Sequence, residues 1–149
     1  MAVSRGRKAL VILLLLVQIV FAIGFGIVAY AHQDEALRWS QPGLLESRIP
    51  RIAFEWVFCA FNSMLTAFQL AVIGMAAWAL VRYTSTNRVL RTAPVAFLIA
   101  AAIGFCSCFA VPDSGDHHID LGRGLPGLGL TILSLVASAT VAASNRLLR

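Results

Sequence analysis

Four apolar blocks separated by charged segments limit the folds that this chain can adopt. They cover residues 9–31, 54–81, 94–111 and 125–143. Each is about 18 to 28 residues long, and a helix needs about 20 residues to cross the roughly 30 Å hydrocarbon core of a bilayer. With 59% hydrophobic residues, the chain is too apolar for an ordinary soluble domain. The sequence therefore predicts an all-α integral, multi-pass membrane protein, a single domain over residues 1–149 in which four transmembrane helices form a compact bundle.

Charged residues divide between the two ends of the expected helices. Basic residues occur in the N-terminal tail, in the connection after the second block and in the C-terminal tail, namely Arg5, Arg7, Lys8, Arg82, Arg88, Arg91, Arg146 and Arg149. All seven acidic residues fall on the other side. The positive-inside rule then places both termini on the cytoplasmic side. The net charge of +5 is thereby attributed to orientation in a lipid bilayer and not to a nucleic-acid partner.

A cleaved signal peptide is the alternative to a membrane span for the first block. The block follows a basic segment and ends in Ala29-Tyr30-Ala31, which has the small-x-small form of a signal-peptidase site. Cleavage there would leave three spans. We favour a retained helix, because the block is longer than a usual signal-peptide core and contains Gln18 and Gly24, which suit helix packing.

A line of polar residues runs along the second block. At about 100° per residue, they fall within roughly 80° of one helical face. Its members are Glu55, Cys59, Asn62, Thr66 and Gln69. An unpaired polar group is costly in hydrocarbon, so this face is predicted to meet protein or a water-filled cavity. Gln18 of the first block lies at nearly the same depth as Gln69, which predicts a hydrogen bond between them.

Glu55 stands at the outer end of this polar line. It lies about 20 Å from the middle of its helix, at the level of the lipid headgroups. Arg51 precedes it by four residues, so an ion pair between the two is predicted. The alternative is that Glu55 serves as a gate or as a binding group for a proton or cation.

The fourth block carries a second line of small and hydroxyl residues. Gly127, Thr131, Ser134 and Ser138 fall within roughly 60° of one face. Small residues at this spacing let helix backbones approach closely. We expect this face to dock on the polar line of the second block, whose amides its hydroxyl groups could satisfy. The alternative is that the two lines border a narrow aqueous path.

Metal-ligand residue types gather in the segment between the third and fourth blocks. Asp116, His117 and His118 lie there, and His32 belongs to the same predicted surface. Carboxylate and imidazole groups suit zinc, copper or iron, so a transition-metal site is one prediction. An ordinary polar loop would have the same composition and is the alternative.

The three cysteines lie in the outer parts of their predicted helices. Cys106 and Cys108 point to nearly opposite sides of one helix and cannot pair with each other. If the second and third helices touch in an oxidising compartment, a disulfide can join Cys59 to Cys106 or to Cys108. Packing as small apolar side chains is the alternative.

Three functions are compatible with this sequence, which has no nucleotide-binding loop, catalytic triad or metalloprotease motif. The first is a non-enzymatic accessory or assembly subunit, whose partners are other membrane protein subunits or copies of itself. The second is a small oligomeric transporter or channel with a path along Glu55, Asn62, Thr66 and Gln69. The third is a membrane enzyme with an outer-surface metal site. We favour the first because the helix faces suit packing and the loops are small.

Overall fold

The computed structural model describes residues 5–40, 49–82, 88–108 and 121–148. They form four α-helices, α1 (Arg5–Trp39), α2 (Ile49–Arg82), α3 (Arg88–Ser107) and α4 (Leu121–Leu147). All four helices are long and apolar enough to cross a membrane. The prediction of an all-helical chain with four such helices is therefore confirmed.

Helix α1 continues well past the span predicted from hydropathy. Its 35 residues extend for about 52 Å, which exceeds the roughly 30 Å hydrocarbon core. Side-chain contacts one turn apart hold its last turns in a helix. Arg38 Nη2 lies 2.7 Å from Asp34 Oδ2, and Trp39 Nε1 donates to Glu35 Oε2 at 2.9 Å. As a result His32, which follows the predicted first block directly, lies within the helix.

Helix α3 begins before its apolar block, which was taken to start at residue 94. It starts at Arg88, so Pro94 lies inside the helix. Proline has no N–H, so the carbonyl of Leu90, four residues earlier, lacks its usual helical donor. Asn145 Nδ2 of α4 donates to that carbonyl instead. Helix α4 also begins before its apolar block, at Leu121 and not at residue 125.

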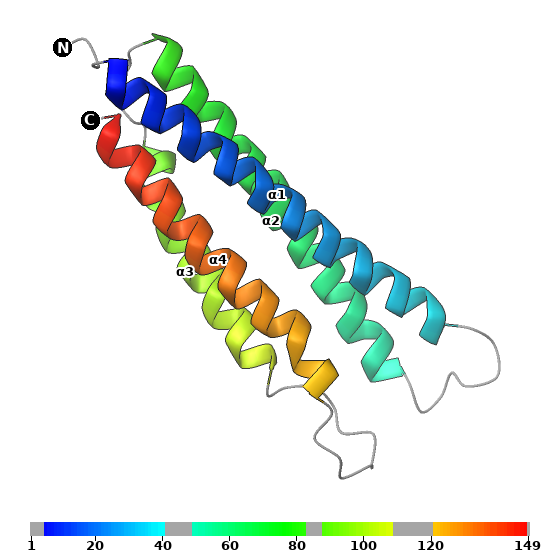
Figure 1. Ribbon diagram of the computed structural model, residues 1–149. Helices are drawn as coiled ribbons and strands as arrows, with labels where there is room; N and C mark the ends of the chain where they lie inside the picture. The colour runs from blue at the N-terminus through cyan, green and yellow to red at the C-terminus, as the bar shows by residue number, and fades with distance from the viewer. Residues whose placement is uncertain (1–4, 41–48, 83–87, 109–120, 149) are drawn as a thin grey trace.

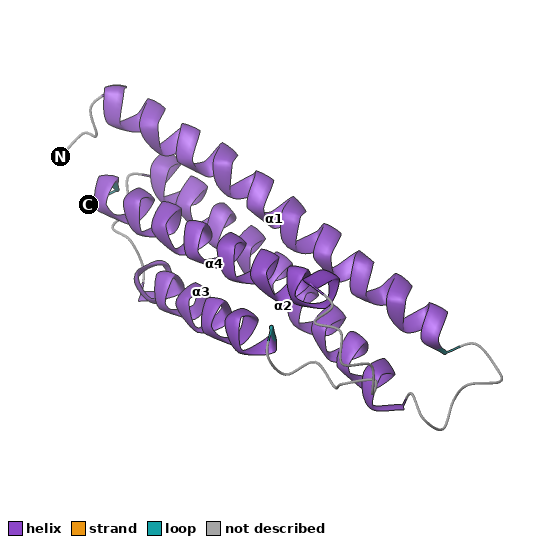
Figure 2. Cartoon of the chain, turned by 60° about the horizontal axis from the view of Figure 1, so that its bottom comes forward, coloured by secondary structure: helices purple, strands orange, loops and turns teal. Residues whose placement is uncertain are grey.

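The helices are arranged as two antiparallel pairs, α1 with α2 and α3 with α4 (Figures 1 and 2). The pairs meet mainly through α1 and α4, whereas α2 has few contacts with α3 and α4. Helix α1 starts, α2 ends, α3 starts and α4 ends at the same end of the molecule (Figure 1). We call it the basic end, and its described basic residues are Arg5, Arg7, Lys8, Arg82, Arg88, Arg91 and Arg146.

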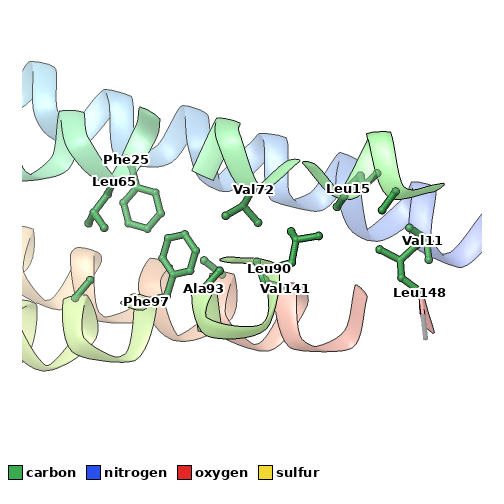
Figure 3. Packing of buried hydrophobic residues seen from close by; sticks show 14 of the residues in the cluster. Val11, Leu15, Phe25, Leu65, Val72, Leu90, Ala93, Phe97, Val141 and Leu148 are labelled. Carbon is green, nitrogen blue, oxygen red and sulfur yellow. The ribbon is translucent and has the colours of Figure 1, made fainter. Parts of the chain in front are cut away.

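A hydrophobic core joins the two pairs. Phe25 of α1 stacks on Phe97 of α3 with 6.1 Å between the ring centroids, and Phe68 of α2 lies 5.4 Å from the same ring. Figure 3 shows Phe25 and Phe97 pointing toward each other across the interface. Around this core the outer faces carry large apolar side chains such as Val20 and Met64, both highly exposed. Such surfaces are typical of helices that face lipid.

Candidate functional site

An ionisable pair is buried between α1 and α2, far from the basic end. His32 Nδ1 lies 2.6 Å from Glu55 Oε2, and the two side chains are only 6% and 11% exposed. The ring of Phe58 covers the imidazole, with 5.3 Å between the ring centroids. Phe54 stacks on Phe58 at 4.5 Å. The two stacked phenylalanine rings therefore cover one side of the imidazole.

The predicted ion pair between Arg51 and Glu55 is wrong. The guanidinium carbon of Arg51 lies 3.9 Å above the Trp39 ring, a cation–π contact. Glu55 points instead at His32 and is buried. Both differences follow from the length of α1, because the extra turns place His32 opposite Glu55 and Trp39 beside Arg51.

The second ring nitrogen of His32, Nε2, is buried and has no hydrogen-bond partner in the described part of the chain. Buried polar groups are normally bonded, so an unpartnered one calls for an explanation. A histidine with one nitrogen held by a carboxylate keeps the other free for a proton or a ligand. The pair is therefore the strongest candidate for a functional site in the described part of the chain.

A second polar cluster joins three helices nearer the basic end. Gln69 Nε2 of α2 donates to Gln18 Oε1 of α1 at 3.3 Å, which confirms the predicted bond. Gln18 Nε2 donates to Ser144 Oγ of α4 at 3.0 Å, and Ser144 Oγ donates to the Thr140 carbonyl at 3.0 Å. All the amides and hydroxyls that connect these helices are buried or partly buried. The cluster ties the α1–α2 pair to α4.

The two polar clusters belong to one antiparallel register. Gln18 precedes His32 in α1 by the same number of residues as Glu55 precedes Gln69 in α2. Midway between them, Asn62 Nδ2 donates to the Phe58 carbonyl at 2.8 Å, and Thr66 Oγ1 donates to the Asn62 carbonyl at 2.9 Å. Those two side chains thus bond their own helix. The equal spacing is visible in the sequence, but the predicted first block ends at residue 31 and so leaves out His32.

The small-residue face of α4 meets α3 and not α2, contrary to expectation. Thr131 Oγ1 donates to the Ala101 carbonyl at 3.4 Å, and Ser138 Oγ donates to the Pro94 carbonyl at 2.8 Å. A Cβ atom added at Gly127 would lie 2.8 Å from the Gly104 carbonyl oxygen, so the two backbones are in direct contact there.

Ser134 lies on the same helix and is fully buried. Its Oγ has no hydrogen-bond partner among the described residues. The close contact of α3 with α4 explains why the face of small residues is used here, because a larger side chain would separate the backbones.

The remaining predicted site residues are not brought together. Asp116, His117 and His118 lie outside the described residues. Within the described ranges, no group of three or more His, Cys, Asp or Glu residues is placed to hold a metal ion. None of the three cysteines forms a disulfide, so Cys59 is not joined to Cys106 in this structure.

The fold and the buried polar contacts define a class, a helical chain with four helices suited to crossing a membrane. Comparisons of this chain with known protein families, with curated proteins and with solved structures find no match. Its function must therefore be argued from the geometry above.

Proposed function

We propose that this chain is a four-span integral membrane protein that acts, without catalysis, as an accessory or assembly subunit of a larger membrane complex. The observation that carries the proposal is the use of interior polar groups as contacts between helices. Gln18 bonds both Gln69 and Ser144, which joins three helices, and Asn145 and Ser138 bond the backbone of α3. Interhelical bonds of this kind stabilise helix packing in membranes.

The aromatic residues support placement across a bilayer. Exposed Trp56 and Tyr30 lie toward the end opposite the basic end, and exposed Trp78 lies near the basic end. Trp56 and Trp78 are about 33 Å apart along α2, close to the thickness of the hydrocarbon core. Aromatic side chains concentrate at both membrane surfaces, and the positive-inside rule then places the basic end in the cytoplasm.

The exposed face of α2 is suited to contact with a helix of another subunit. Val57, Met64 and Trp78 are exposed and recur at multiples of seven residues, on the side opposite the buried Glu55, Asn62 and Gln69. A helix presents one face to a neighbouring helix at this spacing. Because these side chains are exposed, this face is available to another subunit.

Purification from the native membrane in mild detergent, followed by mass spectrometry of the chains that accompany the protein, tests the proposal. We expect a defined set of partner subunits. Met64→Gln should reduce their recovery, whereas Leu13→Gln, an equally polar change on the exposed face of α1, should not. A protein that purifies alone or only with copies of itself would overturn the accessory-subunit proposal.

The buried His32–Glu55 pair favours a second candidate function, a small oligomeric transporter of protons or cations. Ionisable residues inside membrane helices commonly mark ion pathways. The path would start at Glu55 and follow Asn62, Thr66 and Gln69. It predicts ion flux in reconstituted vesicles that Glu55→Gln reduces. Absence of flux, or flux unchanged in that variant, would discard this candidate.

The metal-enzyme alternative rests on residues that the structure does not describe, with the exception of His32. It stays a prediction for Asp116, His117 and His118. Elemental analysis of protein purified without chelators tests it, and stoichiometric zinc, copper or iron is the expected result if a site exists.

A further inference from the structure

Helical geometry directs two arginines, Arg91 of α3 and Arg146 of α4, to the same side of the α3–α4 pair at the basic end. The bond from Asn145 Nδ2 to the Leu90 carbonyl sets the level at which α4 meets α3. Arg91 follows Leu90 in α3, Arg146 follows Asn145 in α4, and both arginines are exposed. A right-handed helix turns about 100° per residue, and these helices run in opposite directions. The step from Leu90 to Arg91 and the step from Asn145 to Arg146 therefore turn toward the same side of the pair.

That side of the α3–α4 pair faces away from the rest of the protein. Ser144, the residue on the other side of Asn145, bonds Gln18 of α1. The side chain of Arg146 consequently projects away from α1, in agreement with its exposure. In a bilayer this side would face lipid.

The charge of the two arginines is not balanced by their own helices. Residues 88–108 and 121–148 contain no aspartate or glutamate. The basic end gathers further positive charge from the other helices, and six of its seven described basic residues are arginines. An anionic group approaching Arg91 and Arg146 thus meets a concentrated positive field.

Exposed apolar side chains lie on the same side of the α3–α4 pair, nearer the middle of the helices. Leu98 follows Arg91 by two helical turns and is 49% exposed. Leu135 precedes Arg146 by three turns and is 47% exposed. The two guanidinium groups would therefore lie at the depth of a lipid headgroup, and the two leucines at the depth of its acyl chains.

We propose that Arg91 and Arg146 together bind the phosphate group of an anionic phospholipid, whose acyl chains lie against Leu98 and Leu135. The planar guanidinium group binds phosphate oxygens with two parallel hydrogen bonds, which makes arginine better suited than lysine to this role. The site requires only that the helices span a membrane, so it is independent of the accessory-subunit proposal.

Native mass spectrometry of the detergent-purified protein, titrated with phosphatidylglycerol, phosphatidylcholine or inorganic phosphate, tests this site. We expect phosphatidylglycerol to bind in preference to the other two. Each basic residue near the membrane contributes about fivefold in affinity, so Arg91→Gln with Arg146→Gln should weaken phosphatidylglycerol binding by about 25-fold. Arg91→Lys with Arg146→Lys should retain part of the affinity, since the charge remains without the bidentate geometry.

A matched control removes the same charge at the opposite end of the molecule. Arg38→Gln with Arg51→Gln should leave phosphatidylglycerol binding unchanged. Equal losses in both double variants would overturn the site and indicate a general charge effect. Equal binding of phosphatidylcholine, or competition by inorganic phosphate at the same concentration, would overturn it as well. A third result would also overturn the site. It is unchanged lipid binding in the Arg91 and Arg146 variant together with capture of an acidic peptide, which would indicate a protein partner. Thermal unfolding of each variant verifies that it is folded, and the lysine variant tests the site if the glutamine variant is not.

Discussion

At the scale of single residues, the polar side chains inside this protein differ in what they hold together. Gln18, Gln69 and Ser144 bond between helices, whereas Asn62 and Thr66 of the same polar line bond the backbone of α2. A bond within one helix forms whether or not the helices meet. Only the first group therefore contributes to helix association.

A double-mutant cycle distinguishes the two groups. Gln18→Leu and Gln69→Leu should show a coupling free energy of about 0.6 kcal/mol and at most about 2 kcal/mol, the range of interhelical hydrogen bonds in membranes. Reversible unfolding in mixed micelles measures it. Gln18→Leu combined with Thr66→Val is the control and should be additive, because Thr66 bonds only its own helix among the contacts described. Coupling of equal size in both cycles would contradict this assignment.

The His32–Glu55 pair is expected to be the most sensitive pair in the protein. Glu55→Ala leaves the buried imidazole without its carboxylate and should destabilise the protein by about 3–5 kcal/mol. The double variant His32→Leu with Glu55→Leu removes both polar groups and should recover most of that loss. Unfolding free energies of the single and double variants provide the measurement. Additive losses would show that the two side chains do not act as a pair.

At the scale of helices, α3 and α4 are joined backbone to backbone. Gly127 lies directly against α3, since a Cβ there would lie 2.5 Å from Ser107 Oγ and 2.8 Å from the Gly104 carbonyl oxygen. The second of these atoms belongs to the backbone and cannot rotate away. A side chain at Gly127 therefore requires the two backbones to move apart.

Gly127→Ala should accordingly destabilise the protein by about 1–3 kcal/mol, the usual cost of overpacking. Gly129→Ala is the matched control, because a Cβ there meets nothing within 4 Å and alanine favours a helix by up to about 1 kcal/mol. The thermal unfolding temperature should fall in Gly127→Ala and rise in Gly129→Ala. A lower unfolding temperature for Gly129→Ala than for Gly127→Ala would contradict the proposed contact.

Pro94 and Asn145 form a compensating pair between these helices. Asn145→Ala leaves the Leu90 carbonyl without a donor, because Pro94 has no N–H to offer it. In a Pro94→Ala background the helix supplies that donor itself. The cost of Asn145→Ala, measured as a change in unfolding free energy, should then be smaller than in the native background. An unchanged cost would show that Asn145 does not act through this carbonyl.

At the scale of the whole molecule, the basic end and the opposite end should lie on different sides of a membrane. A cysteine-free variant carrying either Arg88→Cys or Arg38→Cys tests this, since both positions are exposed. A membrane-impermeant thiol reagent added to intact cells should label Arg38→Cys only, and Arg88→Cys should react after the membrane is opened. Labelling of both from one side would exclude the four-span topology.

The mass of the mature protein tests whether α1 is retained.

Several parts of this structure were predictable because they depend on short stretches of sequence. The four helices follow from apolar runs of sufficient length. The bond between Gln18 and Gln69 was predicted from similar depth in two neighbouring helices and is present. Helix ends were predicted poorly, because they depend on individual contacts such as that of Arg38 with Asp34.

The sequence by itself determined that the chain forms four long apolar helices with charge divided between their ends, because length, hydropathy and charge are local properties. Only the tertiary structure decided which faces meet. It paired His32 with Glu55 instead of leaving Glu55 to Arg51, and it directed the small residues of α4 to α3 instead of α2. These choices depend on contacts between residues far apart in the chain, and several faces of each helix were equally suited to packing.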